Sequence, residues 1–100
     1  MITAWNNGKF SPTGAGYGLR LDLTYRNTVF KRSWTHILLD LPNGTTVRVN
    51  LSSAFWRKCP EVRSAAIGRW LIATGHGRWP KGKPPSFTLI QVIGNHFRVV

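Results

Sequence analysis

Acidic residues are scarce in this chain of 100 amino acids. Three of them, Asp22, Asp40 and Glu61, stand against fourteen Lys and Arg, so the net charge is +11 at neutral pH. Solubility requires far less charge, and self-repulsion at this level works against a compact state. The excess predicts an anionic partner such as nucleic acid or anionic lipid, unless it only solvates the surface. Arginine outnumbers lysine, which favours nucleic acid because guanidinium groups make bidentate hydrogen bonds to phosphate and stack on bases.

Cysteine is almost absent too. Cys59 alone excludes an internal disulfide, and it cannot form a zinc site by itself. The opening residues, MITAWNNGKF, lack the basic and apolar regions of a secretory leader. No apolar run approaches the roughly 18 residues that a membrane-spanning helix needs. We therefore expect a cytoplasmic protein with no membrane span.

Three glycines within five residues raise the question of a phosphate-binding loop in SPTGAGYGLRL, residues 11–21. Such loops lie after a strand and before a helix, whose N-terminal amides hold the anion. Here a strand follows the glycines, and no Gly-Lys-Ser/Thr ending is present. We therefore interpret them as a close-packed entry into a strand. Ser64 and Gly68, four residues apart, likewise predict close approach of another backbone.

The apolar fraction of 42%, with five Trp and five Phe, predicts a packed core. Apolar and polar residues alternate over residues 18–25, 34–41 and 45–51, which predicts three half-buried strands. The sequence Pro-Asn-Gly at 42–44 is typical of a hairpin turn. The three strands are expected to form an antiparallel meander.

A helix is predicted from Pro60 to Thr74. Proline suits the first helical position, Glu61 complements the helix dipole, and Gly75 provides a stop. Ser52 and Ser53 are expected to cap a shorter turn just before it, through Phe55 and Trp56. Residues 75–86 form a basic loop rich in Gly and Pro, and strands at 87–93 and 96–100 follow, joined by a Gly-Asn turn.

These elements predict one α+β domain spanning residues 1–100. Its antiparallel sheet has about five strands in the order β-β-β-α-β-β, with one main helix packed on one face. Residues 1–17 are expected to be irregular, with a short edge strand at 2–5. The strand at 87–93 is apolar on both faces and is expected to be central.

Basic residues recur beside tryptophan in three places, before Trp34, after Trp56 and around Trp79. Such pairs suit nucleic acid because the charge binds phosphate while the indole stacks on a base. They also suit an ordinary domain, in which tryptophan anchors the core and the basic stem covers its edge. Trp79 is the best functional candidate because it lies in the long loop.

Strand alternation adds a second basic group. Arg20 and Arg48 are expected on one outward face, with Thr46 and Asn50 as hydrogen-bonding neighbours. The candidate nucleic-acid-binding residues are therefore Arg20, Lys31, Arg32, Arg48, Arg78, Trp79, Lys81 and Lys83. The expected partner is DNA or RNA.

The pattern GYGLRLDL…W…LPNGTTVRVNL…CPEVRSAAIGRWL, within residues 14–74, resembles the layout of the arm-type DNA-binding domains of phage integrases. Those domains place three strands before a helix, with a Gly-rich entry and a Pro-Glu-Val-like start to the helix. The resemblance implies DNA binding. The loop and the last two strands are additional to that layout.

Two other functions stay open. Exposed aromatic residues would serve a protein-interaction or oligomerisation module equally well. A small metal-independent nuclease would need a histidine beside a partner, and adjacent strands would place Asp22 near His36. His36, His76 and His96 lack metal-ligand spacing, so no metal or cofactor is expected. Cys59 would sit at the N-terminus of the predicted helix, where a thiolate is favoured, but no residue is assigned a catalytic role.

Overall fold

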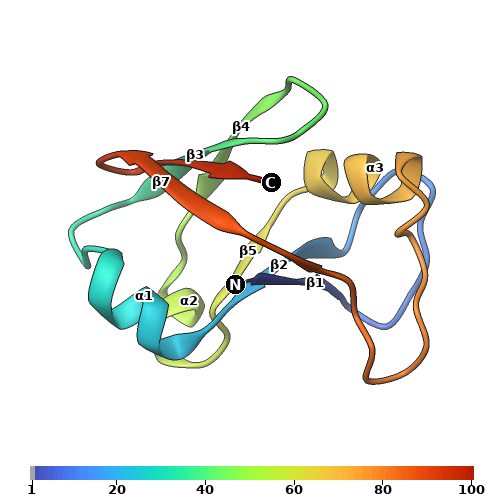
Figure 1. Ribbon diagram of the computed structural model, residues 1–100. Coiled ribbons are helices and arrows are strands. Elements are labelled where there is room, and N and C mark those ends of the chain that lie inside the picture. Colours follow the sequence, from blue (N-terminus) through green and yellow to red (C-terminus); the bar gives the residue numbers. More distant parts are fainter. Residues whose placement is uncertain (1) are drawn as a thin grey trace.

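The computed structural model describes residues 2–100 and arranges them in two four-stranded sheets with short helices at their ends (Figure 1). The strands are β1 (Ile2–Asn6), β2 (Tyr17–Leu21), β3 (His36–Asp40), β4 (Thr46–Asn50), β5 (Glu61–Arg63), β6 (Ser86–Phe87), β7 (Leu89–Ile93) and β8 (His96–Val99). The helices are α1 (Leu23–Val29), α2 (Ser53–Arg57) and α3 (Ala65–Ala73). The α+β class is confirmed, whereas the layout of five strands and one helix is wrong.

The strands divide between two sheets. Sheet A has the order β5-β2-β1-β6 and is antiparallel throughout. Sheet B has the order β4-β3-β8-β7, in which β3 and β8 run parallel and the other pairs antiparallel. The chain passes between the sheets at Thr88, which exchanges two backbone hydrogen bonds with Val100.

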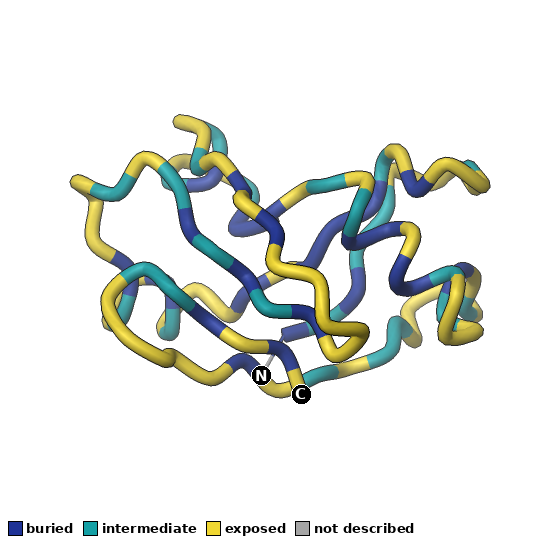
Figure 2. Tube along the Cα trace, turned by 90° about the horizontal axis from the view of Figure 1, so that it is seen from above, coloured by how far each residue is buried: buried dark blue, intermediate teal, exposed yellow. Residues whose placement is uncertain are grey.

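The inner faces of both sheets contribute to one hydrophobic core. Buried residues alternate with less buried ones along β1, β3, β4 and β8, and the loops at the ends are mostly exposed (Figure 2). Leu19 of sheet A and Leu39 and Phe97 of sheet B are completely buried. Phe30, after α1, stacks on Phe97 with ring centroids 4.9 Å apart, so the segment after α1 closes one end of the core.

The first predicted strand is too long. It ends at Leu21, because the Asp22 carboxylate accepts a hydrogen bond from the backbone N–H of Tyr25 (3.1 Å) and caps α1. Arg26, predicted in a turn, is buried inside this helix, where its guanidinium donates to the carbonyl of Phe55 (2.7 Å). A capping side chain therefore overrides a continuing apolar alternation.

The predicted three-stranded meander is wrong, because β2 belongs to sheet A while β3 and β4 belong to sheet B. The β3–β4 hairpin is confirmed, with its turn at residues 42–44 and Gly44 at φ +87°. Val47 and Val49 point inward and Arg48 outward, as the alternation predicts.

The long helix predicted from Pro60 is shorter than expected. Residues 61–63 form β5, because the Pro60 carbonyl accepts from Leu21 N–H and leads the chain into sheet A. The Ser64 side chain then caps α3 by accepting from Ala66 N–H (3.1 Å). Glu61 and Cys59 consequently do not lie at the N-terminus of a helix, contrary to the prediction. The cap of the short turn by Ser52 is confirmed (3.4 Å to Phe55 N–H).

Two strand positions also differ from expectation. β1 lies inside sheet A, between β2 and β6, rather than at an edge. β7 lies at the edge of sheet B rather than at its centre, because the break at Thr88 assigns residues 86–87 to sheet A. The Gly94-Asn95 hairpin turn is confirmed. Within residues 2–100, no helix has the length and apolarity needed to cross a bilayer.

Candidate nucleic-acid interface

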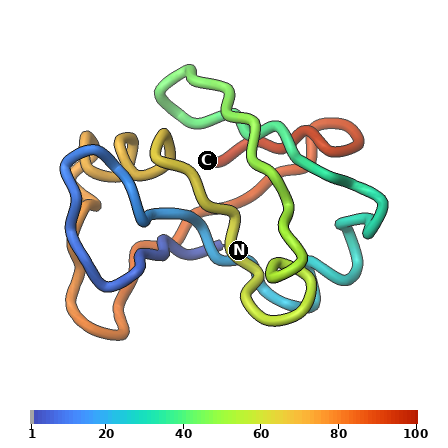
Figure 3. The backbone as a smooth tube through the Cα atoms, turned by 180° about the vertical axis from the view of Figure 1, so that it is seen from behind, coloured from blue at the N-terminus to red at the C-terminus, as the bar shows by residue number. Residues whose placement is uncertain are grey.

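Two loops lie side by side at the end of the molecule beyond α3: residues 7–16 and residues 74–85 (Figures 1 and 3). The Tyr17 hydroxyl donates to the carbonyl of Gly77, and its ring meets Trp79 edge-on at 6.3 Å. The Arg78 guanidinium lies 4.3 Å from the centroid of the Phe10 ring. These contacts join the predicted Gly/Pro-rich loop to the N-terminal loop.

The glycine-rich loop is close-packed, as the sequence predicts, and its neighbour is α3. A Cβ atom added at Gly68 would overlap the backbone of Gly14, and one at Gly14 would lie 2.7 Å from the amide nitrogen of Arg69. Arg69 also donates to the carbonyl of Thr13 (3.2 Å). The two glycines therefore let the loop dock directly on the helix.

The outer face of sheet A brings an arginine onto a tryptophan. Trp5 and Arg63 both pair with Gly18, one from each neighbouring strand. Because glycine has no side chain, nothing separates the two residues. The Arg63 guanidinium lies 4.3 Å from the Trp5 ring centroid, within the range of a cation–π contact.

Glu61 holds both arginines of this face. Its side chain is only 1% exposed, and it accepts hydrogen bonds from Arg20 Nε (3.0 Å) and Arg63 Nη2 (2.9 Å). The two arginine side chains stay 52% and 55% exposed. The carboxylate is thus hidden beneath two cationic groups that reach the solvent.

Three adjoining hollows follow this surface. The first is lined by Thr3, Ala4, Trp5, Asn6, Arg20, Trp79 and Pro84. The second is lined by Asn6, Gly8, Lys9, Phe10, Tyr17, Gly77, Arg78 and Trp79. The third is lined by Trp5, Asn7, Ala15, Gly16, Tyr17, Arg63, Ser64 and Ala65. We call this region the Trp5–Trp79 surface, meaning Trp5, Lys9, Phe10, Arg20, Arg63, Arg78 and Trp79.

The structure brings only part of the predicted site together. Arg20, Arg78 and Trp79 belong to the Trp5–Trp79 surface, and the exposed Lys81 and Lys83 lie in the same loop as Trp79. Tyr17, which lies between two of the glycines, is 1% exposed and belongs to the hydrophobic core.

The other predicted residues lie elsewhere. Lys31 and Arg32 follow α1, at the opposite end of the molecule from the two loops (Figure 1). There the Arg32 guanidinium lies 4.9 Å from the Trp56 ring centroid. Arg48 is on the outer face of sheet B. The expectation that Arg20 and Arg48 share one face is therefore wrong, because their strands belong to different sheets.

Sequence reasoning missed four residues of this surface: Trp5, Lys9, Phe10 and Arg63. Trp5 had a usable signal, because the alternation in Ile-Thr-Ala-Trp places it on the face opposite the buried Ile2. The pairing of Arg63 with Trp5 had none, since it depends on a strand that the sequence presents as the start of a helix.

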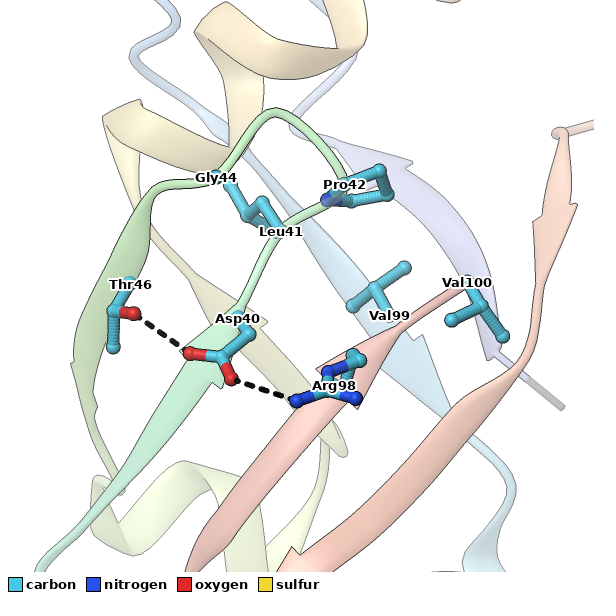
Figure 4. Close-up of a pocket in the computed structure, with 8 residues that line it drawn as sticks. All are labelled: Asp40, Leu41, Pro42, Gly44, Thr46, Arg98, Val99 and Val100. Carbon is cyan, nitrogen blue, oxygen red and sulfur yellow. Dashed lines mark hydrogen bonds and ion pairs between the residues drawn. The ribbon is translucent and has the colours of Figure 1, made fainter.

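Sheet B carries a different charged group, around Asp40 (Figure 4). Its carboxylate accepts from the Thr46 hydroxyl (2.7 Å), lies 2.9 Å from His96 Nε2 and 3.8 Å from Arg98 Nη2. The Thr46 hydrogen bond, followed by the close approach of His96, lowers the pKa of Asp40 below its ordinary value.

A hollow of about 560 Å³ adjoins Asp40, larger than those of the Trp5–Trp79 surface. Its lining is mostly aliphatic, with Leu41, Pro42, Val99 and Val100 around one acid and one arginine. The charges of Asp40 and Arg98 compensate each other. This hollow therefore offers little attraction to a polyanion and has no aromatic wall.

The expected pairing of Asp22 with His36 is not formed. Asp22 caps α1 at the end of a sheet A strand, whereas His36 begins β3 in sheet B. Asp40 and His96 form the observed acid–histidine contact. Within the part of the chain that the structure describes, His, Cys, Asp and Glu do not gather in threes that would hold a metal ion.

Comparisons with protein-family models, curated proteins and solved structures found no match to this chain. The single sheet of three strands that would parallel the integrase arm-type domains is not formed, because β2 and β3 lie in different sheets. The geometry of the Trp5–Trp79 surface is consequently the basis for assigning a function.

Proposed function

We propose that this protein binds DNA or RNA through the Trp5–Trp79 surface. One observation carries the proposal: two arginine–aromatic pairs, Arg63 on Trp5 and Arg78 on Phe10, border adjoining hollows. Guanidinium groups bind phosphate oxygens, and aromatic rings offer stacking surfaces to bases. The combination matches a chain of alternating phosphates and bases.

The charge of this surface supports the same partner. Glu61 is buried under Arg20 and Arg63, so the groups that reach solvent there are cationic. Each guanidinium has five N–H donors and uses few of them on Glu61, which leaves others for phosphate. The exposed Lys81 and Lys83 extend the positive field along the loop. We further propose that the protein meets this partner in the cytoplasm.

The experiment is a titration of labelled DNA and RNA oligomers at roughly 50 and 200 mM salt, in which phosphate contacts predict a steep loss of affinity. Arg78→Ala removes one contact, so it should weaken binding and reduce the salt slope by about one. Arg48→Ala on sheet B is the matched control, with the same charge change and no expected effect on the slope.

No binding at the lower salt would overturn the proposal, and so would equal effects of the two arginine variants. The oligomers recovered on a denaturing gel test the nuclease alternative as well. Intact strands after prolonged incubation contradict that alternative.

A second candidate function is self-association through β7. This edge strand, Leu-Ile-Gln-Val-Ile, has no charged residue, and its Ile90, Val92 and Ile93 are 46%, 44% and 75% exposed. Natural edge strands usually carry charge, proline or a cover that prevents pairing. Antiparallel pairing of two β7 strands about Gln91 would place Ile90 opposite the Val92 of a second copy.

Light scattering across a range of protein concentrations tests this candidate. A concentration-dependent dimer that Val92→Lys dissociates supports it, and a monomer at every concentration contradicts it. Nucleic-acid binding by the Val92→Lys variant then separates the two functions.

A further inference from the structure

Trp79 lines two of the adjoining hollows. It lines the first together with Trp5 and Arg20, and it lines the second together with Phe10 and Arg78. The two hollows measure about 180 and 250 Å³. An aromatic ring that borders two open spaces can offer a stacking surface to a flat group in each of them.

We propose that Trp79 stacks between two consecutive unpaired bases, so that the protein binds single-stranded rather than duplex nucleic acid. This inference rests on the proposed nucleic-acid function and specifies the form of the ligand. One base occupies the hollow shared with Trp5, and the next occupies the hollow shared with Phe10.

The Trp79 indole is held in place before any nucleic acid binds. Tyr17 meets the Trp79 ring edge-on at 6.3 Å and is itself 1% exposed. Its hydroxyl donates to the carbonyl of Gly77, two residues before Trp79. A side chain fixed in this way loses little conformational entropy on binding, which favours stacking of bases on it.

Each hollow also offers polar groups to a nucleotide. Arg20 lines the first hollow, while Lys9 and Arg78 line the second hollow. Each of two successive phosphates would therefore lie near a cationic side chain. Asn6 lines both hollows. Its Oδ1 accepts from Gly8 N–H (2.8 Å), which leaves the Nδ2 amide to donate to a base edge.

A duplex fits this arrangement poorly. Bases in a duplex stack at about 3.4 Å along each strand, which leaves no gap for an indole ring. Insertion of a side chain must then unstack a step, at a cost that a single strand largely avoids. Unpaired bases, in contrast, stack on aromatic side chains with little regard to sequence.

The experiment compares one labelled strand, its duplex and a strand of equal length in which every base is replaced by an abasic unit. At equal salt, the wild-type protein should bind the single strand at least roughly tenfold more tightly than the other two, because stacking contributes that much per base. The abasic strand keeps the phosphates and therefore measures the electrostatic part alone.

The variants Trp79→Phe and Trp79→Leu separate stacking from packing. Both keep apolar contact with Tyr17, but only phenylalanine retains an aromatic face. Trp79→Phe should keep most of the preference for the single strand, and Trp79→Leu should lose it. Trp56→Leu, at the opposite end of the molecule, is the control for tryptophan loss and should leave the preference unchanged.

Equal affinity of the wild-type protein for the single strand, the duplex and the abasic strand would overturn the inference and leave the proposed function standing. No binding to any of the three would overturn both. Should Trp79→Leu unfold, as judged by circular dichroism, the abasic strand with wild-type protein still decides the outcome.

Discussion

The outer faces of the two sheets carry the same kind of charged group in different surroundings. On sheet A, Glu61 is held by two arginines and its side chain is 1% exposed. On sheet B, Asp40 is held by Thr46, His96 and Arg98, and its side chain is 23% exposed. Burial makes the first carboxylate a fixed anchor that orients two cations toward solvent. Exposure leaves the second as a surface network that water and protons reach.

The strongest test of this difference is removal of the basic partners. Replacing both Arg20 and Arg63 by alanine leaves the buried Glu61 carboxylate uncompensated and should cost about 3–5 kcal/mol of the free energy of unfolding. Arg98→Ala, which removes a 57% exposed partner of the half-buried Asp40, should cost less than about 1 kcal/mol. Urea denaturation measures both.

A rescue variant identifies the cause. Adding Glu61→Gln to the double alanine variant removes the buried charge and should recover part of the lost stability. Equal losses at Glu61 and Asp40, or no recovery on neutralising Glu61, would show that burial does not separate the two groups.

Glycine-to-alanine changes compare the two regions next. At Gly68 the added Cβ would overlap the Gly14 backbone, so overpacking should cost about 1–3 kcal/mol. At Gly44 the Cβ meets open space, and only its φ of +87° is unfavourable, at about 1–2 kcal/mol.

Binding separates these two variants more clearly than stability does. Gly68→Ala displaces the loop that carries Phe10, so it should also weaken nucleic-acid binding, whereas Gly44→Ala should not. Equal binding by the two folded variants would argue against a role for the docked loop.

The sequence predicts local structure in sheet B well. Alternation identifies the inward residues Ile37, Leu39 and Val47, and the turns at 42–44 and 94–95 follow from Asn and Gly at positions of tight curvature. These features depend on residues close together in the chain, so their physical causes are visible in the sequence.

Sheet A illustrates what local patterns miss. Asp22 begins a helix where the apolar alternation continues, and Pro60 hydrogen-bonds to a strand that lies far away in the sequence. The Trp5–Trp79 surface was only partly predictable for the same reason. Basic and aromatic character singled out Arg78 and Trp79, but the placement of Arg63 on Trp5 requires the pairing of β5 with β2 and of β2 with β1.

Arginine-to-lysine changes test whether geometry or charge matters in each region. Arg63 contacts Glu61 and the Trp5 ring at once. The ammonium group of lysine is not planar and lacks the array of N–H donors with which a guanidinium makes both contacts. Arg63→Lys should therefore cost about 1 kcal/mol of stability and weaken binding at unchanged net charge. Arg98→Lys should stay within about 0.5 kcal/mol of the wild type. Equal effects of Arg63→Lys and Arg98→Lys on urea denaturation and on nucleic-acid binding would show that only the charge of these residues matters on both faces.

The smallest expected effect concerns Asp40, whose side chain reaches water. The hydrogen bond from Thr46, followed by the close approach of His96, lowers the pKa of Asp40 below the ordinary value of 3.8, so the folded state favours the charged carboxylate more than the unfolded state does. The resulting stabilisation is complete above pH 3.8 and disappears as the pH falls through the lowered value. Asp40→Asn should consequently be less stable than the wild type at neutral pH, and the gap in urea midpoint should close on acidification. Since the two proteins differ at this residue alone, the difference between the two curves isolates Asp40. A gap that stays constant down to the most acidic pH would show that the carboxylate charge contributes nothing to this network.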